Sequence, residues 1–349
     1  MNIGEIAKLA GVSRAAVSRY FNNGYISEEK RQAIRKAVEE TGYRPSMQAQ
    51  TLRTKKTRMI GVIVPKMASE SIGPMVEGML SVLNENGYQM LLAVTQNDPQ
   101  KEVEYLAAFH DKLVDSVILA ATVFTPEHKR ILKKLSVPVV IVGQQLPGYC
   151  CVFHDDYHAI YDMTKLLLER GRTRLGYIGA IPQDKAVGTE RSRGFQDAVR
   201  DAGYEELAEN RAVAAFTMDS GYAKAEELLK KCGVLDGLVC ATDTMAAGAV
   251  QYLKEQGIAV PEQILVTGQG DSEMAKVMEP PLLTIHYSYE KCGQIAVRML
   301  MEQLEQGDVA MREVKLGYSI VESGRDCGQY SKTDTDITRQ LLAEMPGEK

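Results

Sequence analysis

The chain has 349 residues, 25% of them charged, and a formal net charge of −5 at neutral pH. That length predicts two or three domains. The sequence has no apolar run of about 18 residues and no signal peptide, so we expect no membrane contact and a cytoplasmic protein. The six cysteines show no metal-site spacing and no CxxC pair, which favours reduced thiols, no metal and no cofactor.

Charge is distributed unevenly along the chain. Residues 1–58 contain 12 Lys and Arg against 5 Asp and Glu, a net charge of +7. The remaining residues contain 29 against 41, a net charge of −12. A basic head followed by an acidic body predicts that only the N-terminal end contacts nucleic acid.

The N-terminus predicts a first helix over residues 3–9. Asn2 stands at its N-cap position, and Glu5 follows three residues later as a capping-box partner. Gly11 is expected to end the helix in a left-handed turn, and Ser13 is expected to cap a second helix. Two short helices joined by a glycine turn are typical of the helix-turn-helix motif.

The second helix of this motif has two faces. The inward face is expected to hold Ala16, Val17 and Tyr20 or Phe21. The outward face, which would enter the major groove, carries Arg14, Ala15, Ser18 and Arg19. The two arginines have the reach for guanine or phosphate, whereas Ala15 offers only a methyl contact to thymine. A third helix is predicted from a Ser27 cap to Gly42. An amphipathic hairpin without a DNA-binding role is the alternative, and the basic charge argues against it.

The head and the residues that follow it resemble the lactose-repressor (LacI/GalR) family of bacterial transcription regulators, and the body looks closest to its sugar-operon members. The resemblance depends on Val-Ser-x-x-x-Val-Ser-Arg at residues 12–19, Gly-Tyr-x-Pro at residues 42–45 and Ala-Gln-Thr-Leu-Arg at residues 49–53. It implies a DNA-binding domain over residues 1–45 and a hinge helix and linker over residues 46–58. An effector-binding and dimerisation domain would follow over residues 59–324, with a polar, disordered tail over residues 325–349.

The resemblance also implies roles for three linker residues. Leu52 would wedge into the minor groove, where the cost of unstacking a base step is offset by contacts on the bent DNA. Ala49 matches a small position where two hinge helices cross. Lys55 either contacts phosphate or belongs to a solvated linker run. The alternative for Leu52 is ordinary packing on the linker.

After residue 57 the pattern alternates short apolar strands with helices, which predicts an α/β fold with parallel sheets covered on both faces. Strands are expected at 59–64, 89–94, 116–121, 138–143, 174–179, 212–216, 237–241 and 264–267. The resemblance implies a two-lobed sensor like a periplasmic binding protein. Its lobes would span about residues 60–160 and 160–290, and residues 311–323 would return across. Ligands are then expected where strand carboxyl ends of the two lobes face each other.

Polar and aromatic residues near those strand ends are the candidates for binding an effector. They are Asp155, Asp156, Arg191, Phe216, Thr242, Asp243, Gln269 and Asp271. Arg191 stands at the spacing of the family's effector-binding arginine, and a guanidinium fork suits a hydroxyl pair or an anion. Phe216 is either a stacking aromatic or a core residue, and Asp243 and Asp271 are either ligand contacts or helix caps. Gly270 departs from an Asp often present in the family.

The sequence therefore predicts a homodimeric repressor that binds double-stranded operator DNA and is released by a small sugar or sugar phosphate between its lobes. A corepressor-dependent or catabolite-control regulator of the same family is the alternative, and a solute-binding receptor is a weaker one. No enzyme is expected, because the chain has no GxSxG elbow, Walker loop, HExxH motif or glycine-rich dinucleotide turn. His154, beside Asp155, is expected to contact the ligand or to cap a turn.

Overall fold

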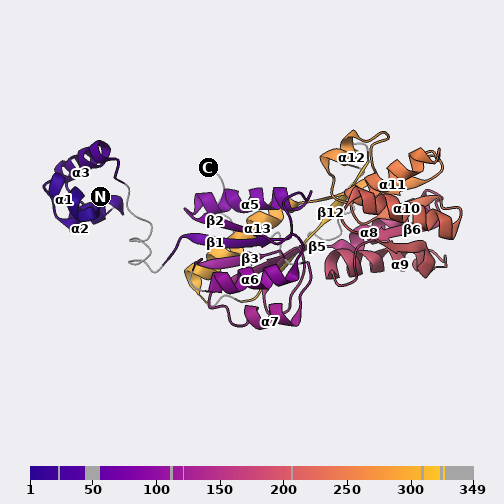
Figure 1. Cartoon of the computed structure of the whole chain (residues 1–349), viewed down its shortest axis with the longest axis horizontal. Helices are drawn as coiled ribbons and strands as arrows, with labels where there is room; N and C mark the ends of the chain where they lie inside the picture. The colour runs from indigo at the N-terminus through magenta and orange to yellow at the C-terminus, as the bar shows by residue number, and fades with distance from the viewer. Residues whose placement is uncertain are drawn as a thin grey trace. The chain divides into compact units, whose positions relative to one another are not determined.

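The computed structural model describes residues 1–22, 24–43, 56–110, 113–120, 122–205, 207–307, 310–322 and 325–326. It divides into two units, Met1–Arg58 and Met59–Lys349 (Figure 1). The hinge positions Ala49, Leu52 and Lys55 lie outside the described residues, as does the tail after residue 326.

The N-terminal unit consists of three helices, α1 (Ile3–Leu9), α2 (Arg14–Phe21) and α3 (Glu28–Thr41). The predicted capping box is confirmed, because Asn2 Oδ1 accepts hydrogen bonds from the backbone N–H of Gly4 and Glu5, while Glu5 Oε2 accepts one from Asn2 N–H at 2.9 Å. Gly11 has φ +62°, the left-handed turn that the sequence predicted. Ser13 Oγ accepts the N–H of Ala16 at 3.2 Å and so caps α2.

The core of this unit is small and lies between the three helices. Ile6, Val17 and Ile34 are fully buried, and Phe21 packs edge-to-face against Tyr20 and Tyr43. Ser27 occupies the N-cap position of α3 but makes no side-chain capping bond, which corrects its predicted role. On α2, the outward residues are exposed or half-buried as predicted, and they are Arg14, Ala15, Ser18 and Arg19.

The second unit begins with a parallel six-stranded sheet in the order β11-β5-β4-β3-β1-β2. Its strands are β1 (Met59–Val64), β2 (Gln89–Val94), β3 (Ser116–Leu119), β4 (Val139–Val142), β5 (Cys150–His154) and β11 (Glu313–Leu316). The central strands are buried on both faces, which explains their continuous apolar runs.

Two pairs of helices cover this sheet (Figure 1). One face is covered by α5 (Ile72–Glu85) and α13 (Tyr289–Gln306), the other by α6 (Pro99–His110) and α7 (Pro126–Leu132). The helices α5 and α13 cross closely at glycines: a Cβ at Gly78 would lie 2.0 Å from Glu290 O, and one at Gly293 would lie 2.0 Å from Met75 O. The helix α7 was not predicted, because seven residues give too short an apolar pattern.

A second parallel sheet follows in the order β7-β6-β8-β9. Its strands are β6 (Leu175–Gly179), β7 (Arg211–Val213), β8 (Gly237–Cys240) and β9 (Leu265–Thr267). It packs against α8 (Asp156–Glu169), α9 (Arg191–Asp201), α10 (Met218–Cys232) and α11 (Asp243–Glu255) in one core. Shorter helices are the π-helix η1 (Lys185–Glu190), the 3-10 helix η2 (Ala208–Asn210) and α12 (Glu273–Val277). The predicted strand over 212–216 is shorter and ends at Val213.

The chain passes between these two layered lobes at three places (Figure 1). The strand β5 leads into α8, β10 (Thr284–Tyr287) leads into α13, and β11 leads into β12 (Tyr318–Glu322). The strand β12 pairs antiparallel with β10 and with β13 (Arg325–Asp326). Lobe 1 therefore comprises residues 59–154 and 289–316, and lobe 2 comprises residues 155–288 and 317–322. The predicted return of residues 311–323 across the lobes is confirmed as far as residue 322, through β11 and β12.

Of the helices that lie in the described part of the chain, none combines the length and the apolar character that a membrane span requires.

Candidate functional site

A hollow of about 540 Å³, here called the cleft, opens between the two lobes. Lobe 1 contributes the loop after β1, and lobe 2 contributes residues that follow β6, β8 and β9. A smaller hollow of about 130 Å³ adjoins the cleft, shares Arg191 with it, and is lined by His154 and Asp156. This is the edge where strand carboxyl ends meet, which is the usual ligand position in open α/β sheets.

Arg191 is the first residue of α9, and its side chain is almost completely buried. Its Nε and Nη2 donate to Asp156 Oδ1 at 2.7 and 2.6 Å, and its Nη1 donates to Ala241 O. The guanidinium carbon lies 5.4 Å from the centre of the Tyr287 ring. Burial raises the pKa of the Asp156 carboxyl, and the Arg191 charge opposes that shift. The guanidinium is therefore fixed in orientation before any ligand arrives.

Among the described residues that line the cleft and the smaller hollow, two buried side chains carry a nitrogen atom without a hydrogen-bond partner. Gln269 is 2% exposed; its Oε1 accepts the Tyr287 hydroxyl at 2.6 Å, but its Nε2 is unpartnered and the residue lines the cleft. His154 Nε2 is also unpartnered, and its residue lines the smaller hollow. Burial lowers the pKa of His154 to about 3, so the ring is neutral at pH 7. Buried unpaired polar atoms are costly, so both atoms favour a polar ligand.

Phe216 supplies an aromatic surface. It lies beyond β7, is half-buried, lines the cleft and packs partly against the core of lobe 2, while its stacking role stays a prediction. Lys66 of lobe 1 has its Nζ 5.6 Å from the ring centre and donates to Phe216 O at 3.2 Å. This contact links the lobes across the cleft.

Two carboxylates in the cleft were missed by sequence reasoning. Asp184 caps η1 by accepting the N–H of Val187 at 3.0 Å, and burial raises its pKa to about 6. Glu70 of lobe 1 accepts the hydroxyl of Thr244 at 3.0 Å, and its pKa is raised by burial and then by the Asp243 carboxylate. No motif marks either residue, because each reaches the cleft only through the fold.

The structure brings four predicted residues to the cleft, namely Arg191, Phe216, Thr242 and Gln269. Thr242 caps α11 by accepting the N–H of Met245 at 3.2 Å, so Asp243 is not that cap. The Asp243 carboxylate is buried behind the cleft, where its oxygens accept Ser272 N–H at 2.9 Å and the Thr284 hydroxyl at 2.5 Å.

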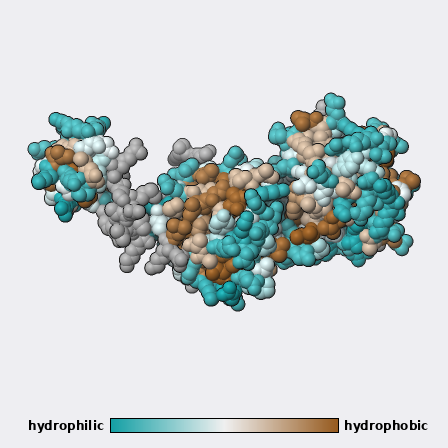
Figure 2. Space-filling view, viewed as in Figure 1, coloured by the Kyte–Doolittle hydropathy of each residue, from teal (hydrophilic) through white to brown (hydrophobic). Residues whose placement is uncertain are grey.

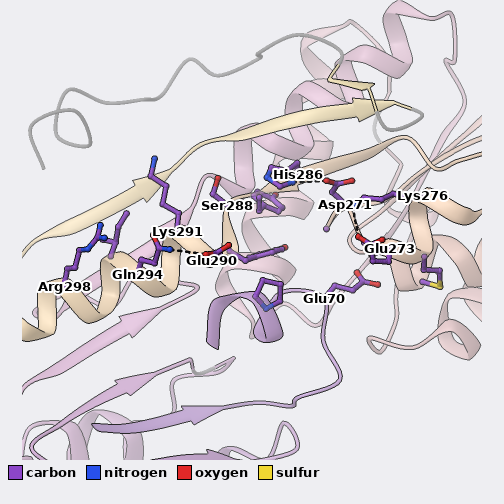
Figure 3. A pocket seen from close by; sticks show the side chains of 17 residues that line it. Glu70, Asp271, Glu273, Lys276, His286, Ser288, Glu290, Lys291, Gln294 and Arg298 are labelled. Atoms are coloured by element: carbon purple, nitrogen blue, oxygen red, sulfur yellow. Dashed lines mark hydrogen bonds and ion pairs between the residues drawn. The ribbon is translucent and has the colours of Figure 1, made fainter. Parts of the chain in front are cut away.

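Asp155 and Asp271 line neighbouring hollows. Asp155 caps α8, accepts from His158 Nδ1 at 2.9 Å and faces a hollow of about 430 Å³. Asp271 has φ +50°, accepts from His286 Nδ1 at 2.9 Å and faces a hollow of about 800 Å³ (Figure 3). The prediction that Asp271 caps a helix is wrong, because Ser272 caps α12. Within the described ranges, no cluster of three or more His, Cys, Asp or Glu side chains has a metal-binding arrangement.

The raised pKa of Asp184 predicts that this residue lowers the folding stability by an amount that depends on pH. An acid whose pKa rises from 3.8 to about 6 on folding binds its proton more tightly in the folded state, so stability falls as pH rises through that window. Asp184→Asn keeps the capping oxygen and removes the charge. We expect it to raise the free energy of unfolding by about 2–3 kcal/mol at pH 7, at ~1.4 kcal/mol per pKa unit.

The gain should shrink as the pH is lowered toward 5. Urea unfolding of the full chain at both pH values measures it, with the exposed Asp219→Asn as the matched control. A gain that does not change between the two pH values would contradict the assignment.

Comparison with known proteins gives consistent matches over nearly the whole chain. Residues 2–46 match the bacterial regulatory proteins of the lacI family, and residues 164–323 match the periplasmic binding protein-like domain. The chain is 32% identical over 313 residues to the sucrose operon repressor of Staphylococcus xylosus, covering 89% of this chain and 96% of that protein.

Solved structures share the fold. A complex of the transcriptional regulator CelR with cellobiose is similar with a TM-score of 0.72 and 27% identity, covering 94% of this chain and 100% of that one. The lac repressor dimer bound to operator and the anti-inducer ONPF aligns with a TM-score of 0.84 and 22% identity, covering 92% and 98%. Together with the helix-turn-helix head and the two-lobed unit, these matches show that the chain belongs to the lacI family of bacterial regulatory proteins.

Proposed function

We propose that the protein is a homodimeric repressor of a carbohydrate-utilisation operon, held on operator DNA by its heads and released when a small neutral sugar binds in the cleft. The observation that carries the sugar assignment is the donor and acceptor set of the cleft. A fixed guanidinium on Arg191, an unpartnered amide nitrogen on Gln269 and a carboxylate on Glu70 line the same hollow as the Phe216 ring. Sugars offer hydroxyls to such groups and a ring face to the aromatic side chain.

Charge in the cleft favours a neutral sugar over a sugar phosphate. Among the described residues that line the cleft and the smaller hollow, the cations are Lys66 and Arg191 and the carboxylates are Glu70, Asp156 and Asp184. Asp156 already pairs with Arg191. A phosphate would therefore meet an acidic excess, whereas hydroxyls can donate to the carboxylates. The sucrose operon repressor and the CelR–cellobiose complex support a carbohydrate class.

The head supports sequence-selective DNA binding. Arg14, Ala15 and Arg19 are exposed on the second helix of a helix-turn-helix, the helix that enters the major groove in this motif. Two heads in a symmetric dimer would read two half-sites of a pseudo-palindrome. A repressor that binds operator DNA would act in the cytoplasm, where the bacterial DNA lies.

The surface of lobe 1 supports the dimer. In the described part of the chain, β2 ends its sheet and pairs with β1 on one side only. Its Met90, Leu91 and Leu92 are half-buried, and Leu80 of α5 is 37% exposed. Figure 2 shows hydrophobic residues gathered in this area of lobe 1. An apolar edge of this kind is commonly covered by a partner.

Release requires that the sugar bind one lobe arrangement more tightly than the other. The cleft meets this condition because lobe 1 supplies Lys66 and Glu70, while lobe 2 supplies Arg191, Phe216 and Gln269. A ligand that contacts both sets favours one angle between the lobes. We infer that this angle sets the spacing of the two hinge segments and hence their fit to DNA.

The first test is operator binding by the purified full chain. We expect a sequence-selective shift on the DNA upstream of its own gene, which weakens as salt rises. One sugar from a panel of sucrose, fructose, glucose and cellobiose should reverse that shift. Absence of a selective shift at low salt would refute the repressor assignment, and a sugar that strengthens binding would reverse the sign of the response.

The second test concerns Arg191. Arg191→Lys keeps a positive charge beside buried Asp156 but loses the planar fork. We expect sugar affinity to fall at least ~10-fold, since bonds to charged groups contribute about 1.5–3 kcal/mol, while operator affinity without sugar is unchanged. Calorimetric titration measures the sugar affinity and gel shift measures the operator affinity. Arg200→Lys, on the exposed face of α9, is the control. A variant that still responds normally would remove Arg191 from the site.

The third test concerns Leu52, which the family resemblance assigns to the minor groove. Leu52→Ala removes the apolar wedge, so operator affinity should fall while sugar affinity stays the same. Gel shifts and calorimetry on the same preparation give both quantities. Unchanged operator affinity would eliminate the wedge.

A further inference from the structure

Gly270 leaves a gap in lobe 2 that a side chain from lobe 1 fills. It follows Gln269 in the loop after β9 and has φ +137°, a conformation that favours glycine. A Cβ at this position would lie 2.9 Å from Glu70 Oε2 and 3.3 Å from Asp243 Oδ2. Any larger residue at position 270 would therefore displace the Glu70 carboxylate. The absence of a side chain here admits a carboxylate from the opposite lobe.

Glu70 lies in the turn between β1 and α5 and reaches across to lobe 2. Its Oε1 accepts the Thr244 hydroxyl at 3.0 Å, and the side chain lines both the cleft and the hollow of about 800 Å³. Figure 3 shows it extending from lobe 1 toward Asp271 and toward Glu273, the first residue of α12. Within the described lining of the cleft, it is the one carboxylate that lobe 1 contributes.

The surroundings of Glu70 disfavour the charged form of its carboxylate. Burial raises its pKa, and the neighbouring Asp243 carboxylate raises it further, while the Thr244 and Ser272 hydroxyls oppose the shift. A carboxylate offers about four acceptor positions, and two hydroxyls from lobe 2 leave some of them open. A ligand with hydroxyl donors would add hydrogen bonds to the Glu70 carboxylate and so stabilise its charged form.

We propose that Glu70 is an effector-binding carboxylate, which accepts hydroxyl hydrogen bonds from the sugar and joins lobe 1 to the ligand opposite Arg191 and Gln269. This inference rests on the proposed function, because it assumes a sugar in the cleft. It assigns to Glu70 the discrimination between sugars that present a hydroxyl at this place and sugars that do not. A sugar without that hydroxyl would bind more weakly, because it would cover the half-buried Glu70 carboxylate without donating a hydrogen bond to it.

The test is calorimetric titration of the full chain with sucrose, fructose, glucose and cellobiose. Glu70→Gln keeps the size of the side chain and removes the charge. We expect the sugar that binds the wild-type chain to bind this variant about 10-fold to 100-fold more weakly, as for the loss of a hydrogen bond to a charged group. Glu104→Gln, an equivalent change on the exposed side of α6, should leave the affinity unchanged.

Monodeoxy analogues of that sugar separate direct contact from a structural effect. If Glu70 touches a hydroxyl, its substitution and the removal of that hydroxyl should be strongly non-additive for one analogue. Additive losses for every analogue would overturn the direct contact. The thermal midpoint without sugar should not fall in Glu70→Gln, since the variant removes a half-buried charge beside Asp243.

Two further outcomes separate this inference from the proposed function. Wild-type affinity in Glu70→Gln together with weakened binding in Arg191→Lys would overturn the role of Glu70 and leave the sugar cleft standing. No binding of any panel sugar or of its analogues to the wild-type chain, with operator binding intact, would refute the sugar assignment and this inference together.

Discussion

The buried ion pair between Asp156 and Arg191 is the interaction on which the cleft depends. The Arg191 side chain is almost completely buried, where an unpaired guanidinium would carry a large desolvation penalty. Asp156, the first residue of α8, supplies a carboxylate to it, and Ala241 supplies a carbonyl. Because Asp156 lies directly after the β5 crossover, the pair ties lobe 2 to the point where the chain leaves lobe 1. The same contact that satisfies a buried charge therefore orients the ligand-binding fork.

The crossovers and the ligand site share residues. Tyr287 ends β10 and Tyr289 begins α13, on either side of one crossover, and both rings pack against His154 at another. Tyr287 also holds Gln269 through its hydroxyl. A ligand that bonds to Gln269 thus acts on groups packed at two of the three connections between the lobes. This arrangement gives a local binding event a physical route to the angle between lobes, as a ligand-controlled regulator requires.

Much of this architecture was predictable because it depends on local chemistry. Short sequence patterns predict the capping box at Asn2, the left-handed conformation of Gly11 and the continuous apolar strands, and the structure confirms all three. The cleft was predictable in part, since Gln269 follows a strand end and Arg191 stands at the spacing of the family's effector-binding arginine. Glu70 and Asp184 were not, because their proximity to the cleft arises from long-range packing that no spacing records. Asp243 illustrates the opposite case, a residue that lies at a strand end as predicted but does not line the cleft. Its carboxylate accepts hydrogen bonds from Ser272 and Thr284 behind the cleft.

The three crossovers have a consequence for how the chain is made. Lobe 2 is inserted into lobe 1, whose sheet is completed by β11 and one of whose faces is covered by α13 together with α5. On the ribosome, the four-stranded sheet of lobe 2 is fully synthesised at residue 267, before α13 or β11 exists. Until α13 and β11 are synthesised, the part of this apolar face that α5 does not cover therefore stays exposed. Lobe 2, although inserted, can therefore fold first. Lobe 1, which is synthesised first, should be the part that depends more on chaperones.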